Sequence, residues 1–257
     1  MFNEFLNFFK YTWAKRIKPF KAFKALRALS ANKEDTVQVF HIIEALKGPR
    51  NRYFKDFKKS NVGNRILKDR IHLIDILKNR DYLAKLPKDT LGYKYFRFVH
   101  DEDLTADELA EASEIYPRHK NTSDEEHLFN KRLRDMHDLW HVTTGYGRDA
   151  LGELSLLAFT YAQGKNRGIG AIVLYGYWQV GRSSKSEMPL RKVIRQGYRL
   201  GKEATFWAYE DWEKLLELPL VEVREQLNSK KPSLYQEILR KYIALEEDVA
   251  EEQAVAV

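Results

Sequence analysis

The stretch MHDLWHVTTGYGRDALGE, from Met136 to Glu153, predicts two helices joined by a tight turn. Gly145 and Gly147 can adopt the left-handed backbone conformations that end a helix. Asp149 then follows as an N-cap, because its carboxylate can accept hydrogen bonds from the first free amides of the next helix. The stretch therefore predicts an α-helical hairpin.

Helical spacing continues on both sides of this hairpin. Apolar residues recur three and four positions apart through most of the chain, and only 7 prolines and 13 glycines interrupt them. We expect one helix to begin at Ser123, in a capping box with Glu126, and to run through His141. The next is expected over Ala150–Gln163, followed by a buried helix over 169–180. The pattern predicts an all-α protein.

Further helix signals lie outside this central part of the chain. They share either an apolar face of helical period, a capping box or a proline at a helix start, and they are found at 35–46, 65–77, Thr105 with Glu108, after Pro189 and after Pro232. No repeat and no low-complexity tract interrupts them. We expect a single helical domain over residues 30–245.

The two ends of the chain differ in charge. The formal net charge is +7, yet residues 1–29 alone carry seven basic residues against the single acid Glu4. Residues 246–257 form an acidic tail with five carboxylates. The predicted organisation is thus a basic segment over 1–29, the helical domain over 30–245 and the tail over 246–257.

The basic segment has the pattern of a helix that lies in a membrane interface. Its lysines alternate with large apolar residues at spacings of three and four, which suits an apolar face in the acyl boundary and cations on anionic headgroups. Pro19 is expected to kink or divide this helix. A docking helix and an organelle transit peptide are the alternatives. The apolar residues are Phe2, Phe5, Phe9, Trp13, Ile17 and Phe20.

Several classes of protein are disfavoured by composition. The absence of cysteine excludes disulfides, thiolate zinc sites and cysteine nucleophiles. Nucleic-acid binding is not expected, because the excess positive charge is concentrated in an aromatic-rich helix. The longest nearly unbroken apolar run, 169–180, is too short to span a bilayer.

The hairpin also predicts a metal site. On one helix His137, Asp138 and His141 fall within an arc of about 100°. Glu153 lies in the first turn of the next helix, which an antiparallel hairpin returns to the end of the previous one. Two imidazoles with one or two carboxylates suit a divalent metal such as zinc, iron or manganese.

These residues also allow other interpretations. The histidines could be ordinary surface or core residues, and Glu153 could favour a helix N-terminus for its charge alone. The zinc-protease motif HExxH requires Glu where this chain has Asp138. Phosphohydrolases with an HD doublet need a further His upstream and an Asp downstream, and nothing in the sequence recommends candidates for them.

The spacing HDxxH, eleven residues, Glu resembles the signature of the coenzyme Q (ubiquinone) biosynthesis protein 4 family. Three further stretches are similar to that family: ANKEDTVQVFHIIEAL at 31–46, LPKDTLGYKYFRF at 86–98 and WEKLLELPLVEVREQL at 212–227. The similarity runs from about Arg27 to about Gln226 and leaves out the basic start and the acidic tail.

The resemblance implies a helical, peripheral membrane protein of ubiquinone synthesis that acts on the ring of a polyprenylated hydroxybenzoate-type precursor. It implies oxidative decarboxylation, in which a hydroxyl replaces the ring carboxyl at C1, and organisation of the other ubiquinone-biosynthesis enzymes into a complex. The ligands would be His137, Asp138, His141 and Glu153, with Asp138 also catalytic, and the metal is usually described as zinc.

The chemistry of the ligands leaves the metal and the role open. Zinc has no redox chemistry, so iron or manganese would serve as well, or zinc would act as a Lewis acid while oxygen takes the electrons. The alternative function is a lipid-binding scaffold without catalysis. The expected location is the cytoplasmic side of a bacterial inner membrane, or the matrix side of the mitochondrial inner membrane in a eukaryote. Association into a homo-oligomer is compatible with the sequence.

Substrate contacts are predicted close to the hairpin. The apolar stretch GIGAIVLYGYW at 168–178 is expected, with Leu156, Leu157 and Phe159, either to line a groove for an isoprenoid tail or to pack the core. Arg148 and Arg182 are candidates for contact with a substrate carboxylate.

Overall fold

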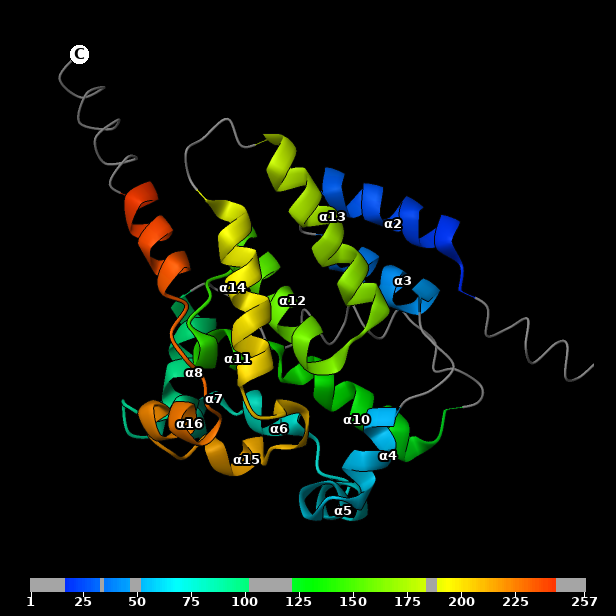
Figure 1. Ribbon diagram of the computed structural model, residues 1–257. Coiled ribbons are helices and arrows are strands. Elements are labelled where there is room, and N and C mark those ends of the chain that lie inside the picture. Colours follow the sequence, from blue (N-terminus) through cyan, green and yellow to red (C-terminus); the bar gives the residue numbers. More distant parts are fainter. Residues whose placement is uncertain (1–16, 33–34, 47–51, 102–121, 184–188, 244–257) are drawn as a thin grey trace, which may run out of the picture.

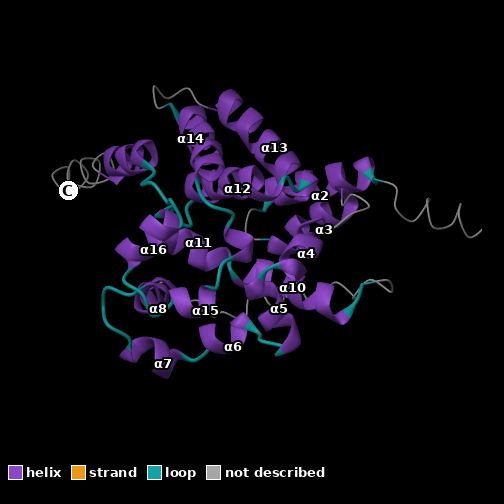
Figure 2. Ribbon diagram, turned by 60° about the horizontal axis from the view of Figure 1, so that its bottom comes forward, coloured by secondary structure: helices purple, strands orange, loops and turns teal. Residues whose placement is uncertain are grey.

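The described part of the chain is all-helical (Figure 1, Figure 2). In the computed structural model the described residues are 17–32, 35–46, 52–101, 122–183 and 189–243. Within them no strand is formed, and one isolated β-bridge joins Thr90 to Pro219. The all-α prediction is confirmed. The expected helix at Thr105, residues 1–16 of the basic segment and the acidic tail lie outside the described ranges.

The helices follow one another with short connections. In chain order they are α2 (Pro19–Ala31), α3 (Thr36–Leu46), α4 (Arg52–Lys59), α5 (Asn61–Lys68), α6 (Leu73–Leu77), α7 (Arg80–Lys85), α8 (Leu91–Asp101), α10 (Asp124–Asp135), α11 (His137–Thr144), α12 (Ala150–Gly164), α13 (Arg167–Ser183), α14 (Leu190–Glu203), the 3-10 turn η1 (Trp207–Tyr209), α15 (Trp212–Leu215), α16 (Leu220–Gln226) and a last helix over 233–243.

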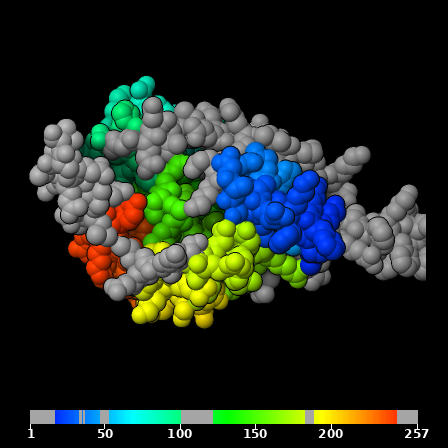
Figure 3. Space-filling view, turned by 90° about the horizontal axis from the view of Figure 1, so that it is seen from above, coloured from blue at the N-terminus to red at the C-terminus, as the bar shows by residue number. Residues whose placement is uncertain are grey.

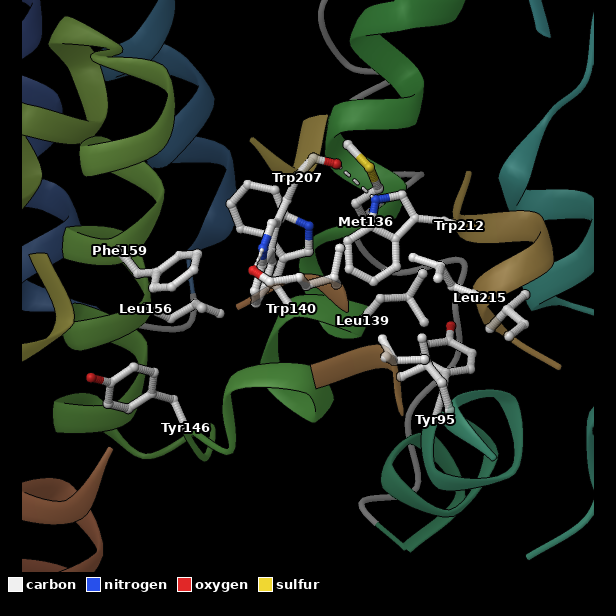
Figure 4. Packing of buried hydrophobic residues seen from close by; sticks show 14 of the residues in the cluster. Tyr95, Met136, Leu139, Trp140, Tyr146, Leu156, Phe159, Trp207, Trp212 and Leu215 are labelled. Atoms are coloured by element: carbon white, nitrogen blue, oxygen red, sulfur yellow. Dashed lines mark hydrogen bonds between the residues drawn. The ribbon is translucent and has the colours of Figure 1, made fainter. Parts of the chain in front are cut away.

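The main core is centred on aromatic rings (Figure 4). The ring of Trp207 lies 5.3 Å from that of Trp140 and 4.6 Å from that of Phe159, and Trp212 lies 5.9 Å from Trp207. The indole nitrogens of Trp207 and Trp212 donate to the carbonyls of Leu227 and Trp207. Because Trp140 belongs to α11 and Phe159 to α12, this core fixes both helices of the hairpin.

The packing of α12 on α14 depends on two glycines. A Cβ on Gly197 would lie 2.4 Å from the carbonyl oxygen of Ser155, and one on Gly201 would lie 2.5 Å from that of Phe159. Only glycine lets the two backbones approach this closely. The position of α12 is therefore set by backbone contact as well as by side chains.

A smaller cluster joins the N-terminal helices to α13. Ala25 and Leu26 of α2, Ile42 of α3 and Ile172 of α13 are buried against one another. A third cluster joins α4, α5 and α10 around Phe57 and Phe129, and does not involve the hairpin.

The expected helix over 65–77 is wrong as a single element. The structure divides it into α5 and α6, because Arg70 adopts a left-handed conformation with φ 51°. The amide of Ile71 donates to the carbonyl of Ile66, which is the bond that closes a Schellman motif. Sequence reasoning looks for glycine at such a position, and here an arginine occupies it.

Two other expectations are corrected. The helix from Ser123 is interrupted at Met136, between α10 and α11, although Ser123 caps α10 as predicted. Pro19 occupies the first position of α2, where its missing amide hydrogen costs nothing, and the part of the basic segment before residue 17 lies outside the described residues. The helix over 169–180 is real, but it is not buried: α13 is half-exposed along one side.

Candidate metal centre

The hairpin predicted from the sequence forms between α11 and α12. Gly145 ends α11 with φ 83°, and its amide donates to the carbonyl of His141 at 2.8 Å. Asp149 caps α12, its carboxylate accepting from the amides of Leu151 and Gly152 at 3.0 Å each. Gly147, expected to share the left-handed conformation, does not have a positive φ. One left-handed residue is enough to make the turn.

The hairpin brings the imidazoles and the carboxylate of Glu153 together. The Nε2 atoms of His137 and His141 are 3.2 Å apart. Oε1 of Glu153 lies 3.2 Å from Nε2 of His141, and Oε2 lies 3.6 Å from Nε2 of His137. Asp138 contributes a carboxylate oxygen, and the ligand atoms of His137, Asp138 and His141 all lie within 4.8 Å of one another. The two imidazoles thus lie near both carboxylates, with Glu153 in contact with each ring and Asp138 in the same ligand group as the two rings.

The ring of His141 is oriented from outside the cluster. Its Nδ1 lies 3.0 Å from the carbonyl oxygen of Tyr146. A carbonyl only accepts, so Nδ1 carries a hydrogen, and the other ring nitrogen, Nε2, faces the cluster. Phe98 stacks on the same ring with 5.6 Å between centroids. Such outer contacts are typical of histidines that bind metals.

The charges of the cluster compensate one another. Burial would raise the pKa of Glu153, but hydrogen bonds from His137 and His141 outweigh it and hold that pKa well below its usual range. Burial would lower the pKa of His137, but the hydrogen bond to Glu153 and the charge of Asp138 raise it overall. The carboxylates thus favour a positive charge at the imidazole of His137, as they would favour a metal cation.

The cluster is partly accessible to solvent. The side chain of His141 is fully buried, whereas those of His137 and Glu153 are 27% and 33% exposed. Hard oxygen and borderline nitrogen donors, a fixed imidazole tautomer and an accessible side all fit a divalent metal with a free coordination position.

Residues from the C-terminal third support the hairpin, and sequence reasoning missed them. Arg224 of α16 donates from Nε to the carbonyl of Thr143 at 2.9 Å and from Nη2 to that of Val142 at 3.2 Å. The hydroxyl of Tyr235 donates to Asp149 and accepts from the amide of Gly147 at 2.9 Å. Nothing in the spacing of the sequence signals these contacts, because they join segments about 80 residues apart.

A buried tyrosine lies within range of the charge of Asp138. Tyr95 of α8 is 2% exposed, and burial together with the charges of Asp138 and Asp135 raises its pKa far above the usual range. It therefore stays protonated. Sequence reasoning gave it no role, since it appeared only inside the stretch over 86–98.

The remaining predicted contacts have mixed outcomes. Arg148 lies close enough to His137 for its charge to act against protonation of that ring. Arg182 instead covers the ring of Trp178, 4.7 Å from its centroid. Leu156 and Phe159 are buried in the main core, which agrees with the packing interpretation of these two residues rather than with a groove.

The family of the chain follows from comparison with known proteins. The profile of the coenzyme Q (ubiquinone) biosynthesis protein Coq4 matches residues 18–233, which is most of the chain. The chain belongs to this family. Its fold is also similar to a crystal structure of a protein from Nostoc punctiforme, with a TM-score of 0.59, 24% identity and coverage of 84% of this chain and 100% of the other.

Curated relatives carry the same family name. Ubiquinone biosynthesis proteins COQ4 of Aedes aegypti, Saccharomyces cerevisiae and Talaromyces marneffei, all named as mitochondrial, are 29%, 27% and 29% identical over 66%, 73% and 78% of this chain. The chain spans 60%, 54% and 67% of their respective lengths. Among the helices that the structure describes, none combines the length and the apolar character needed to cross a membrane.

Proposed function

We propose that this protein is a metal-dependent C1 decarboxylase and hydroxylase of ubiquinone synthesis, acting on a polyprenylated hydroxybenzoate-type ring. The observation that carries this proposal is that the cluster is partly accessible to solvent. Structural metal sites are closed by their protein ligands, whereas catalytic sites keep a position for substrate. The side chains of His137 and Glu153 are partly exposed, which suits a site that substrate can reach.

The proposed reaction is a two-electron oxidation of the ring acid. The ring carboxylic acid and one water give the ring phenol, carbon dioxide, two protons and two electrons, and dioxygen accepts the electrons and protons. The bond from C1 to the carboxyl carbon breaks, and a bond from C1 to oxygen forms. The reaction therefore requires a two-electron oxidant, and the proposal assigns this role to dioxygen, which is reduced to hydrogen peroxide.

The residues of the chain have distinct roles in this proposal. His137, His141, Glu153 and Asp138 would hold the metal, which supplies Lewis acidity toward the substrate carboxylate or phenol. Arg148 lies near His137 and adds positive charge where an anionic substrate would arrive. Asp138 is the candidate for moving a proton to or from the ring, because Glu153 is engaged by both imidazoles.

The alternative is a lipid-binding scaffold in which the metal only joins two helices. It is favoured by one observation, that the ligands come from the two arms of one hairpin, so a metal there would fix the hairpin. In that case partner enzymes of the pathway would carry out the chemistry.

The deciding experiment compares wild-type protein with a His137→Ala, His141→Ala double variant. Metal content is measured first, followed by release of carbon dioxide from a prenylated 4-hydroxybenzoate-type acid with and without oxygen. About one metal per chain that is absent from the variant, with oxygen-dependent release of carbon dioxide, supports the enzyme. Stoichiometric metal without turnover under zinc, iron or manganese loading supports the scaffold.

A second variant separates catalysis from assembly. Asp138→Ala is expected to abolish turnover while helix content and binding of partner enzymes are retained. Asp138→Asn keeps the size of the side chain and loses its charge, so it controls for packing. Lost partner binding with intact turnover would contradict the catalytic role.

A further inference from the structure

The helices α2 and α13 form one exposed face of the protein, called here the α2–α13 face. They run side by side in Figure 1, and in Figure 3 their surfaces adjoin on the side seen from above, α2 in dark blue and α13 in yellow-green. Gln179 of α13 donates to the hydroxyl of Ser30 of α2 at 2.6 Å. The inner sides of both helices are joined by the cluster around Ile42 and Ile172.

The outer sides of these helices are unusually apolar. The side chains of Phe20 and Phe23 on α2 are 90% and 57% exposed, and those of Leu174 and Trp178 on α13 are 70% and 49% exposed. With Ile17 just before α2, these residues are half of the ten large hydrophobic residues exposed in the described part of the chain. Such a concentration marks an interaction surface.

The same outer sides are positively charged. On α2 the exposed charges are Lys21, Lys24 and Arg27, and on α13 they are Arg167 and Arg182. The sequences of the two helices, PFKAFKALRALSA and RGIGAIVLYGYWQVGRS, contain no aspartate or glutamate. The face therefore presents large apolar side chains together with basic side chains and no acidic ones from these two helices.

One contact resembles a residue pair at a lipid interface. The guanidinium of Arg182 lies over the indole of exposed Trp178. Tryptophan is enriched at the level of lipid headgroups, where its ring is partly apolar and its nitrogen meets water, and a neighbouring cation can reach the phosphates. Sequence reasoning had placed this helix in the interior, so this half of the face is visible only in the structure.

We propose that the α2–α13 face docks on the surface of an anionic phospholipid bilayer, with α13 inserting Leu174 and Trp178 beside α2. A second copy of the chain is a poorer occupant, since two such faces would bring like charges together. Nucleic acid accounts for the cations but not for the aliphatic and phenylalanine side chains.

Docking by this face would place lipid next to the helix that packs on α12, which carries the candidate metal ligand Glu153. On its inner side α13 packs against α12, where a Cβ on Gly176 would lie 2.7 Å from Leu154, the residue next to Glu153. The α2–α13 face and the cluster are thus connected through α12, which carries Glu153. The use of this geometry for a lipid-tailed substrate rests on the proposed function, whereas the docking itself does not.

The test is flotation of the full chain with phosphatidylcholine vesicles that contain or lack phosphatidylglycerol. The double substitution Leu174→Ser, Trp178→Ser is expected to weaken binding to the anionic vesicles by about tenfold or more. The reason is that the variant lacks two apolar side chains whose transfer from water into the bilayer favours binding. Val221→Ser with Ile243→Ser, which removes exposed apolar residues outside this face, should bind as the wild type does. Circular dichroism and metal content control for folding.

Charge and insertion have separate measurements. Lys21→Gln, Lys24→Gln and Arg27→Gln should each reduce the preference for phosphatidylglycerol by roughly fivefold. In a Trp13→Phe background, brominated lipid should quench indole fluorescence, and Trp178→Phe should remove that quenching, since Trp140, Trp207 and Trp212 are buried.

Three results would overturn the proposal. One is vesicle binding by the α13 double variant equal to that of the wild type. Another is a variant that still binds vesicles but has lost self-association, as measured by light scattering. That result would assign the face to contact with a second copy of the chain. The third is tighter binding to duplex DNA than to anionic vesicles at physiological salt. None of them depends on turnover, so failure here and failure of the proposed function are distinguishable.

Discussion

At the scale of single residues, proton and metal compete for one position. A metal binds the neutral imidazole, so the raised pKa of His137 extends proton competition to higher pH than for an isolated histidine. We expect metal affinity to rise with pH through that pKa and then to level off. Glu153, whose pKa is lowered, stays ionised throughout this range.

Glu153→Gln tests this balance. The variant loses a charged ligand and also the partner that raises the pKa of His137. At high pH, metal should bind at least 10-fold more weakly, because loss of even an outer hydrogen-bond partner of a ligand weakens metal binding by about 10-fold to 100-fold. The pH at the midpoint of the rise in metal affinity should move to a lower value. Calorimetric titration with zinc across pH measures both. A weaker affinity with an unmoved midpoint would contradict the coupling between Glu153 and His137.

At the scale of elements, α16 holds the end of α11. The half-buried guanidinium of Arg224 binds two carbonyls of the last turn of α11, those of Val142 and Thr143, and His141 directly precedes these two residues. Arg224→Met leaves these carbonyls without their charged donor and should lower the free energy of unfolding by about 1–3 kcal/mol. Because the end of α11 then moves, metal affinity should fall as well.

Arg240→Met is the matched control, since Arg240 is exposed and bonds only within its own helix in the described contacts. Its effect on unfolding by urea should stay within about 0.5 kcal/mol. An Arg224 variant that is destabilised but binds metal as tightly as the wild type would limit Arg224 to a structural role.

The elements also show what the sequence could predict. The hairpin was readable because Gly145, Asp149 and the spacing of His137, His141 and Glu153 are local signals, and local geometry is enough to bring those side chains together. The break at Arg70 was not readable, since it is a left-handed residue without glycine. The exposure of α13 was not readable either, because an apolar helix has the same pattern in a core and on a lipid-facing surface.

At the scale of the whole molecule, the position of the metal ligands depends on packing far from them. Glu153 lies on α12, and α12 is held against α14 by the contact of Gly197 with the backbone of Ser155. Gly197→Ala would push a methyl group to 2.4 Å from a backbone oxygen, so the helices must separate. Overpacking of this kind costs about 1–3 kcal/mol.

Gly164→Ala provides the control. Gly164 lies in α12, the helix that carries Glu153, and a Cβ at this position meets nothing within 4 Å. It should be neutral or slightly stabilising, by up to about 1 kcal/mol. Gly197→Ala should in addition weaken metal binding, since moving α12 moves Glu153 relative to His137 and His141. Thermal unfolding with and without zinc measures both effects: the metal-induced rise in Tm should shrink in Gly197→Ala and persist in Gly164→Ala. Equal rises in both variants would mean that the hairpin holds its ligands without α14.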